Sequence, residues 1–185
     1  GIPEPPHSAV QRSYQQALYH LTKSLDPSRP VSGNDGWEQM ATDIFAVHDY
    51  HHSGDVLDGR YRSETVFRDT LTTFRSAGRA LALEGHAWAG QPVMLTEFGG
   101  IAFFIGQEAG WGYSQAKDAD DFLVRYADVL RPTTESTLLA GYCYTQLTDT
   151  YQEQNGVLTM ERKPKADIAR IRAANLGVPV ERLPQ

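Results

Sequence analysis

The sequence contains one cysteine, Cys143, among its 185 residues, so an internal disulfide is impossible. It has no apolar run near the ~18 residues that a membrane-spanning helix needs. It also lacks an excess of basic residues, because the formal net charge is -6 and no block of like charges forms a tail. We therefore expect neither a nucleic-acid nor a membrane partner. The compartment stays open, with the cytoplasm as the working expectation.

Several motifs of well-known enzyme classes are also missing. No Gly-x-Gly-x-x-Gly follows a predicted strand, no phosphate-binding P-loop occurs, and no serine lies in a nucleophile elbow. Cys143 lies inside an apolar run, where a cysteine packs more often than it reacts. The sequence thus gives no support for dinucleotide binding or serine-hydrolase chemistry, and we expect no cofactor.

The sequence does contain an alternation of apolar runs and amphipathic segments. Apolar runs that end in polar residues are typical of buried parallel strands that carry functional side chains to their carboxyl ends. The alternation predicts parallel βα units in a barrel or a doubly wound sheet. Asp118 is the expected N-cap of the third helix. Strand candidates are residues 30–33, 43–50, 93–97 and 141–147; helices are expected at 8–25, 65–74, 118–130 and 164–175; residues 79–91 are ambiguous and 101–115 form a predicted loop.

The third strand candidate ends in a carboxylate, Glu97, followed by Gly99 and Gly100 after one phenylalanine. A glutamate at the end of a rigid strand can serve as a nucleophile. The two glycines let the chain turn sharply away and leave the carboxylate accessible. The alternative is a structural glutamate that caps a turn or pairs with an arginine, and the pattern alone leaves both interpretations open.

A cluster of polar residues, His48, Asp49, Tyr50, His51 and His52, follows the second strand candidate. Adjacent histidines on a strand point to opposite faces, so they converge poorly on one metal ion, and we expect no metal site. The cluster instead predicts a polar rim for a hydroxyl-rich ligand, with Tyr50 donating a hydrogen bond to an anionic neighbour. The alternative is a loop with solvated histidines.

Aromatic residues in the predicted loops suit stacking on the apolar face of a sugar ring, although ordinary packing is the commoner role for any one of them. Trp111, flanked by Gly110 and Gly112, is the strongest candidate for a ligand contact, and Trp37 is a second. Gln146 follows the last strand candidate and offers an amide to hydroxyl groups, or satisfies a loop backbone.

Together these segments resemble the C-terminal half of the catalytic barrel of glycoside hydrolase family 2, which includes β-galactosidases, β-glucuronidases and β-mannosidases. The Thr-Glu-Phe-Gly-Gly element around Glu97 and the Gln-Leu-Thr-Asp element from Gln146 are the more specific parts. The resemblance extends over almost the whole chain. It is carried by residues 29–31, 44–50, 92–100, 141–149, 152–156 and 162–165.

The resemblance implies an α/β fold: a partial (β/α)8 TIM barrel that spans residues 1–185, with strands 5–8 and their helices and without the N-terminal half. It implies a retaining mechanism, in which Glu97 is the nucleophile at the end of the seventh strand and Tyr50 hydrogen-bonds it from the end of the sixth. Asn34 and Asp35 would close the fifth strand and Gln146 the eighth. The substrate-binding residues implied or predicted are Asn34, Asp35, Trp37, His48, Asp49, Tyr50, Trp111 and Gln146.

A retaining enzyme needs a second carboxyl group about 5 Å from the nucleophile. In the family this acid/base glutamate follows an asparagine at the end of the fourth strand, and we expect that motif to precede Gly1. Glu4 does not follow an asparagine on a strand, so it is no substitute. The expected partners are a carbohydrate substrate, the missing half-barrel, accessory β domains and, through exposed barrel edges, a second copy of the chain.

The sugar is the least determined part of this interpretation. A glucuronate site requires cationic side chains to bind the sugar carboxylate. Near the predicted strand ends the sequence offers only Arg60 and Arg62. This favours a neutral sugar and β-galactosidase-like activity in the parent, with weak or no activity for the chain alone. The alternatives are β-glucuronidase or β-mannosidase specificity, or a half-barrel that binds carbohydrate without cleaving it.

Overall fold

The computed structural model describes residues 9–105 and 110–178. Glu4 and the first residue of the predicted N-terminal helix, Ser8, lie outside the described residues. None of the described helices combines the length and the apolar character needed to cross a bilayer.

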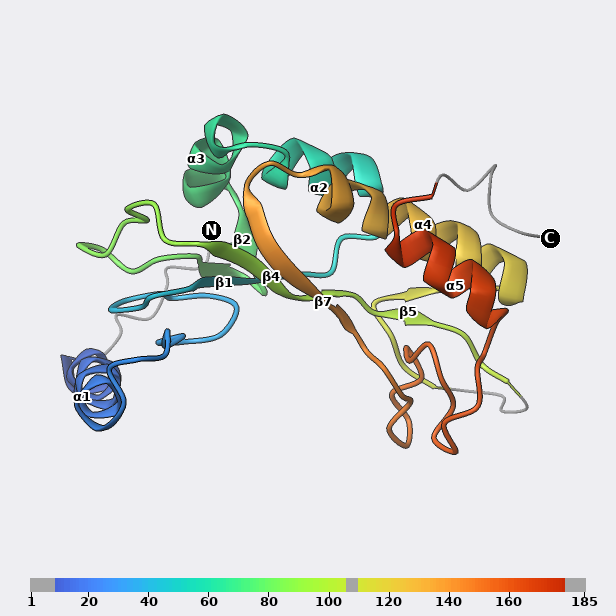
Figure 1. Ribbon diagram of the computed structural model, residues 1–185, viewed down its shortest axis with the longest axis horizontal. Helices are drawn as coiled ribbons and strands as arrows, with labels where there is room; N and C mark the ends of the chain where they lie inside the picture. The colour runs from blue at the N-terminus through green and yellow to red at the C-terminus, as the bar shows by residue number, and fades with distance from the viewer. Residues whose placement is uncertain (1–8, 106–109, 179–185) are drawn as a thin grey trace.

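The main sheet has three parallel strands in the order β1 (Phe45–Asp49), β4 (Val93–Gly99) and β7 (Leu139–Thr145), so β4 is central (Figure 1). Because the strands are parallel, their carboxyl ends meet at one edge of the sheet. Two small ladders flank it: an antiparallel hairpin of β2 (Arg75–Ser76) with β3 (Arg79–Ala80), and a parallel pair of β5 (Ile101–Ala102) with β6 (Ser114–Gln115).

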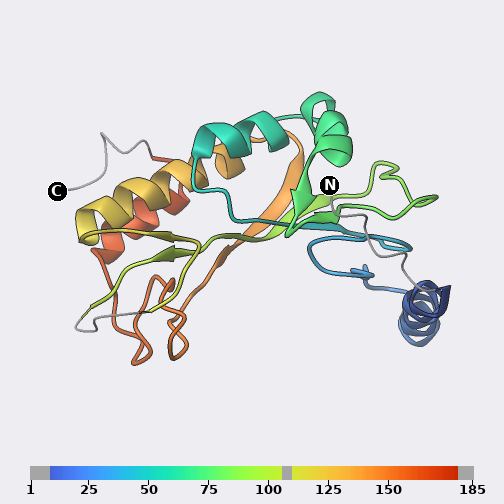
Figure 2. The same cartoon turned by 180° about the vertical axis from the view of Figure 1, so that it is seen from behind.

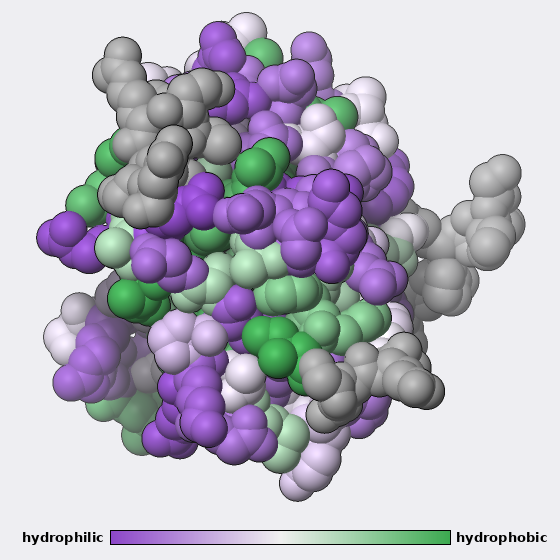
Figure 3. Space-filling view, turned by 90° about the vertical axis from the view of Figure 1, so that its right-hand side faces the viewer, coloured by the Kyte–Doolittle hydropathy of each residue, from purple (hydrophilic) through white to green (hydrophobic). Residues whose placement is uncertain are grey.

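Helices α2 (Gly54–Tyr61), α3 (Glu64–Thr73) and α4 (Ala119–Glu135) lie on one side of this sheet, and α5 (Ile168–Asn175) packs along α4 (Figure 1). Helix α1 (Ala9–Leu25) stands apart from these helices, as the view from behind also shows (Figure 2). On the face to the right of Figure 1, hydrophilic areas surround a central band of hydrophobic residues (Figure 3).

One apolar core lies between the sheet and its helices. All five residues of β1 are buried, and so are the apolar residues of β4 that point toward the helices. Phe45 of β1 meets Phe67 of α3 edge to face, with 5.8 Å between the ring centroids. The core explains why apolar runs in the sequence become buried strands, and it makes the strand ends a rigid platform for the side chains that follow.

Most predicted elements are present. The helices at 8–25, 65–74 and 118–130 and the strands at 43–50, 93–97 and 141–147 correspond to α1, α3, α4, β1, β4 and β7. The Asp118 carboxylate accepts a hydrogen bond from the Asp121 N–H at 2.8 Å, as expected of an N-cap. The α/β class with a parallel sheet is therefore confirmed.

The prediction of a short strand at residues 30–33 is wrong. Pro30 has no N–H to give to a ladder. The Val31 N–H goes to the Asp43 side chain at 3.0 Å, and the Gly33 N–H to the Thr42 hydroxyl at 3.0 Å. Side chains thus satisfy this backbone, and the main sheet has three strands where the partial barrel called for four.

Three smaller expectations also differ from the structure. Helix α2 follows the polar cluster at residues 48–52, in a stretch for which no element was predicted, and its weak amphipathic pattern explains why the sequence did not indicate it. The last helix begins at Ile168, because Asp167 caps it, instead of at residue 164. The predicted loop at 101–115 contains β5 and β6 at its ends, while residues 106–109 lie outside the described part.

Candidate active site

The pairing of β1 with β4 places His48 opposite Glu97 at the carboxyl ends of the strands. The register shifts between Val47 and His48, so that Thr96 is the extra residue of a bulge in β4. As a result Thr96 and Glu97 are both partly exposed, although successive residues of a regular strand point to opposite faces. The bulge brings both polar side chains to the same edge of the sheet.

Glu97 is held by Tyr50, which follows β1. The Tyr50 hydroxyl donates a hydrogen bond of 2.5 Å to Glu97 Oε2, as predicted for its anionic neighbour. Burial first, and then this bond to the carboxylate, raise the pKa of Tyr50 well above its usual range. Tyr50 therefore remains a protonated donor, and Glu97, whose side chain is 39% exposed, stays open to a ligand.

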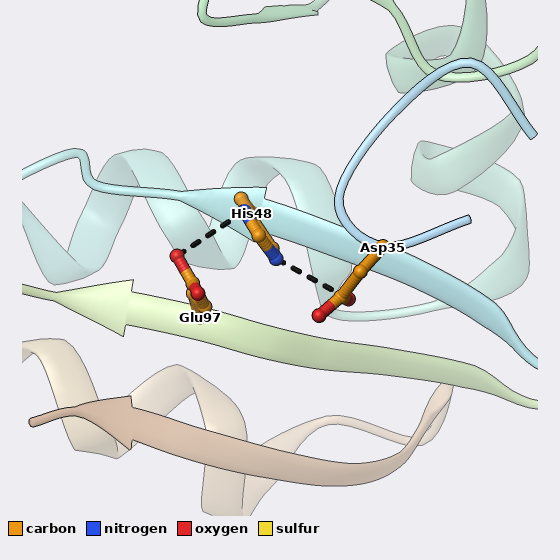
Figure 4. A group of neighbouring side chains, drawn as sticks. All are labelled: Asp35, His48 and Glu97. Carbon is orange, nitrogen blue, oxygen red and sulfur yellow. Dashed lines mark ion pairs between the residues drawn. The ribbon is translucent and has the colours of Figure 1, made fainter. Parts of the chain in front are cut away.

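His48 lies between two carboxylates (Figure 4). Its Nδ1 is 3.2 Å from Glu97 Oε2, and its Nε2 is 3.2 Å from Asp35 Oδ1. Asp35 also accepts a hydrogen bond of 2.5 Å from the Thr96 hydroxyl. The His48 side chain is 10% exposed, so this ring is a buried link between Asp35 and Glu97.

Two neighbours fix the plane of the His48 ring. Trp37 meets it edge to face with 5.2 Å between centroids. Gly36 has a φ of +89°, and a Cβ at that position would lie 2.5 Å from the imidazole. Only glycine fits there, because both the backbone conformation and the close approach exclude a side chain.

Asp35, His48 and Glu97 also form the one group of potential metal ligands found among residues 9–105 and 110–178, with ligand atoms within 4.8 Å of one another. The two imidazole nitrogens face different carboxylates, so the ring itself occupies the space where a shared ion would lie. We therefore do not assign these residues as metal ligands.

A cavity of about 450 Å³ opens beside Glu97. Its walls come from the end of β1, from helix α2 and from the β2–β3 hairpin. The hairpin is held to β1 by the Ser76 hydroxyl, which donates a hydrogen bond to the His48 carbonyl at 2.6 Å. Two guanidinium groups, those of Arg60 and Arg75, are among the lining groups. The lining residues are Trp37, His48, Asp49, Tyr50, His51, His52, Arg60, Phe74, Arg75, Ser76, Ala77, Glu97 and Tyr113.

Asp49 lines this cavity but its carboxylate is committed to the protein. Its side chain is 2% exposed, and Oδ2 accepts hydrogen bonds from Arg60 at 2.6 Å and from the Tyr61 hydroxyl at 2.8 Å. The backbone N–H of His51 donates to Oδ1 at 3.1 Å. We expected Asp49 to contact substrate; its position instead fits a role in orienting Arg60, whose guanidinium also covers the Phe74 ring at 4.2 Å.

Four predicted ligand contacts do not line the cavity: Asp35, which lies behind His48, and three residues that make other contacts. Asn34 donates to the Trp37 carbonyl at 2.6 Å and shapes the turn that carries Asp35. Gln146 donates to the Thr150 hydroxyl at 3.1 Å within its own loop. Trp111 is 47% exposed and lies two rings from Glu97, because it packs against Tyr113, which stacks on Tyr50.

The structure thus joins Asp35, Trp37, His48 and Tyr50 to Glu97. Sequence analysis missed Thr96, Phe74 and Arg75 as neighbours of this site. The Ala77-Gly78 pair between β2 and β3 was a hairpin signal that could have placed Arg75 near a strand end. No local pattern relates the hairpin to β1, since that contact exists only after the chain has folded.

No family model matches the chain, and no curated protein sequence matches it. Several solved protein structures are similar to the chain. The GH2 β-galacturonidase from Eisenbergiella tayi bound to galacturonate has a TM-score of 0.56 and 16% identity, over 92% of this chain and 31% of that one. The Bifidobacterium dentium β-glucuronidase complexed with coumarin-3-O-glucuronide has a TM-score of 0.56 and 20% identity, over 91% and 27%.

The β-D-glucuronidase of Dictyoglomus thermophilum is similar as well, with a TM-score of 0.54 and 14% identity over 94% of this chain and 29% of that one. At these identities the likeness concerns the fold alone. The chain spans less than a third of the length of these three proteins. The described residues therefore share their fold with a segment of larger glycosidases.

Proposed function

We propose that this chain carries the nucleophile part of a retaining β-glycosidase, with Glu97 as the nucleophile. The observation that carries the proposal is the position of Glu97: a part-exposed carboxylate at the end of the central strand, beside a cavity, with one oxygen bound by Tyr50. The resemblance of the sequence around Glu97 to glycoside hydrolase family 2 supports it, and so does the fold of the solved glycosidases.

In the proposed reaction a Glu97 oxygen attacks the anomeric carbon while the bond to the leaving oxygen breaks, and a glycosyl-enzyme ester forms. Water then attacks the same carbon, the ester bond breaks, and Glu97 is regenerated as a carboxylate. Tyr50 keeps its proton throughout, so it stabilises the carboxylate that departs in the second step.

The leaving oxygen in this reaction needs a proton donor. Among the described carboxylates, Asp35 lies within 4.8 Å of Glu97, close to the ~5 Å of a retaining pair. Asp35 does not line the cavity, and its carboxylate already accepts a hydrogen bond from Thr96 and lies 3.2 Å from His48 Nε2. We assign the acid/base to a residue beyond this chain, which makes the chain alone a weak catalyst, since a general acid contributes about 10²–10⁴-fold.

Two sugar classes are compatible with the site. The sequence resemblance favours a β-galactosidase-like, neutral sugar. The second candidate is a uronic acid, and the cavity favours it, because Arg75, which the sequence did not place near the strand ends, lines it together with Arg60. The names of the galacturonidase and the glucuronidases of the same fold support this second candidate.

The test is the intact mass of the chain after incubation with 2-deoxy-2-fluoro glycosyl fluorides. The panel contains the galactosyl, mannosyl, glucuronyl and galacturonyl compounds. Fluoride leaves with little help from a general acid, so the absent donor matters less. We expect one glycosyl group on a peptide that contains Glu97, no adduct on Glu97→Gln, and an unchanged adduct on the matched control Glu84→Gln, whose side chain is exposed and distant from the cavity.

The reactive compound identifies the sugar class. Labelling by uronyl fluorides that Arg75→Gln weakens about tenfold, with neutral fluorides inert, would establish the acidic candidate. Labelling by the galactosyl fluoride that Arg75→Gln leaves unchanged would establish the neutral one. An adduct on another residue would refute Glu97 as the nucleophile. No adduct in any case would favour the remaining alternative, a half-barrel that binds carbohydrate without cleaving it.

A further inference from the structure

We propose that His48, backed by Asp35, positions the nucleophile by clamping one oxygen of Glu97, so that Oε1 is the oxygen that attacks the sugar. This inference rests on the proposed function, because it assigns the two oxygens of the same carboxylate. His48 was expected to contact substrate; the clamp makes it a positioning residue that acts through Glu97.

Both recorded contacts to the carboxylate of Glu97 fall on the same oxygen. The Tyr50 hydroxyl donates to Oε2 at 2.5 Å, and His48 Nδ1 lies 3.2 Å from Oε2. A carboxylate oxygen that two neighbouring groups engage is a poorer nucleophile than its twin, because its electron density is already shared. The arrangement therefore separates a fixed oxygen, Oε2, from a reactive one, Oε1.

The imidazole of His48, which makes the second contact with Glu97 Oε2, also has Asp35 on its other side. His48 Nε2 is buried and has no hydrogen-bond partner among the described residues, while Asp35 Oδ1 lies 3.2 Å from it. Asp35 is in turn bound by the Thr96 hydroxyl, one residue before Glu97. Thr96, Asp35, His48 and Glu97 thus close a ring of polar contacts across the β4 bulge. Figure 4 shows the part of it formed by Asp35, His48 and Glu97.

The clamp places a different carboxylate against each imidazole nitrogen. A neutral imidazole has one N–H and can serve one carboxylate, whereas the imidazolium carries an N–H on each nitrogen and can serve both. Asp35 from the preceding turn and Glu97 from β4 are the acidic groups at the ring, and Tyr50 meets it through Glu97. The farther ionisable groups around the same cavity are Asp49, His51, His52, Arg60, Arg75 and Tyr113.

The first test reads the ring directly and needs no reaction. The chain is labelled with ¹⁵N-histidine, and both ring nitrogens of each histidine are observed through the carbon-bound ring protons near neutral pH. The His48 signals are those lost in His48→Phe, whose ring keeps the contact with Trp37. We expect the His48 ring-nitrogen signals to shift in Asp35→Asn and again in Glu97→Gln, because each nitrogen faces one of the two carboxylates.

An unchanged Nδ1 signal in Glu97→Gln would overturn the clamp, because that nitrogen is the one that lies against Glu97. An unchanged spectrum in both Asp35→Asn and Glu97→Gln would overturn it as well, because the ring would then be insensitive to the two carboxylates. These outcomes stand whether or not any fluorosugar reacts. A failure of the glycosidase proposal is therefore distinguishable from a failure of the clamp.

The second test measures the rate at which Glu97 is labelled by the fluoride that reacts with the unsubstituted chain. We expect His48→Phe to slow labelling by about 100-fold and Asp35→Asn by about tenfold, because a misplaced nucleophile loses its alignment with the anomeric carbon. His20→Phe, a matched change on exposed α1, should leave the rate unaltered. Equal rates for His48→Phe and the unsubstituted chain would overturn the positioning role.

Discussion

Helices α1 and α4 are both 17 residues long and both carry an apolar stripe, yet their surroundings are opposite. Eight residues of α4 are buried, among them Phe122 and Leu130, while none of α1 is. Side chains on the α1 stripe are 44% to 78% exposed. The stripe therefore specifies which face of a helix can be buried, whereas the rest of the fold determines whether that face is covered.

The two helices are also held by different forces. Helix α4 lies in the apolar core against α2 and α5. Helix α1 is joined to the body of the chain by polar contacts: Tyr19 donates to Asp43 at 2.6 Å, and Lys23 lies 3.0 Å from the same carboxylate. Hydrophobic burial and partly exposed ion pairs differ in strength and in their response to pH, so the comparison can be tested by substitution and by acid.

The largest expected difference is between matched leucine substitutions. Leu130→Ala in α4 should lower the free energy of unfolding by about 2–5 kcal/mol, because it leaves a cavity in the core. Leu21→Ala in α1, where the side chain is 54% exposed, should change it by about 0.5 kcal/mol or less. Chemical denaturation followed by circular dichroism measures both, and equal losses would contradict the contrast between the helices.

A smaller effect should come from the N-terminus of α4. Asp118→Ala removes the side chain that accepts from the Asp121 N–H and should cost about 1 kcal/mol of unfolding free energy. Asp120→Ala is the matched control, because Asp120 lies on the same turn and makes an exposed ion pair with Arg170. The same denaturation assay applies, and a cost for Asp120→Ala as large as that for Asp118→Ala would rule out capping as the cause.

The smallest effect concerns the attachment of α1 in acid. The Tyr19 hydrogen bond, and then Lys23, lower the pKa of Asp43 from the ordinary 3.8 despite an opposing desolvation. A lowered folded-state pKa stabilises the attachment above the unfolded value and loses that stabilisation as pH falls through the folded one. Amide chemical shifts of α1, followed from about pH 6 to about pH 3, should therefore change below about pH 4.

Asp43→Asn is the control for this acid effect, because it removes the titrating group and should abolish the transition in α1. The amide shifts of α4 report on the core over the same range. If α4 changed at the same pH as α1, the transition would be global unfolding and not the release of one helix.

The position of Glu97 at a strand end and its contact with Tyr50 could be predicted from the sequence for a local reason. A buried strand is a short apolar run, and the polar residue that ends it must emerge at the sheet edge, which identified Glu97 and Tyr50. The same reasoning assigned Asn34, Gln146 and Trp111 to ligand contact, but it could not tell a polar residue that faces the cavity from one that satisfies its own loop.

The sequence by itself determined the α/β class, the positions of the main strands and most helices, and the carboxylate at the end of the central strand, because these follow from local periodicity and from turn-forming residues. Only the tertiary structure decided that His48 links Asp35 to Glu97, that Asp49 is held by Arg60 and Tyr61, and that Arg75 reaches the cavity. These residues are distant along the chain, and packing of the hairpin and α2 onto the strand ends brings them together.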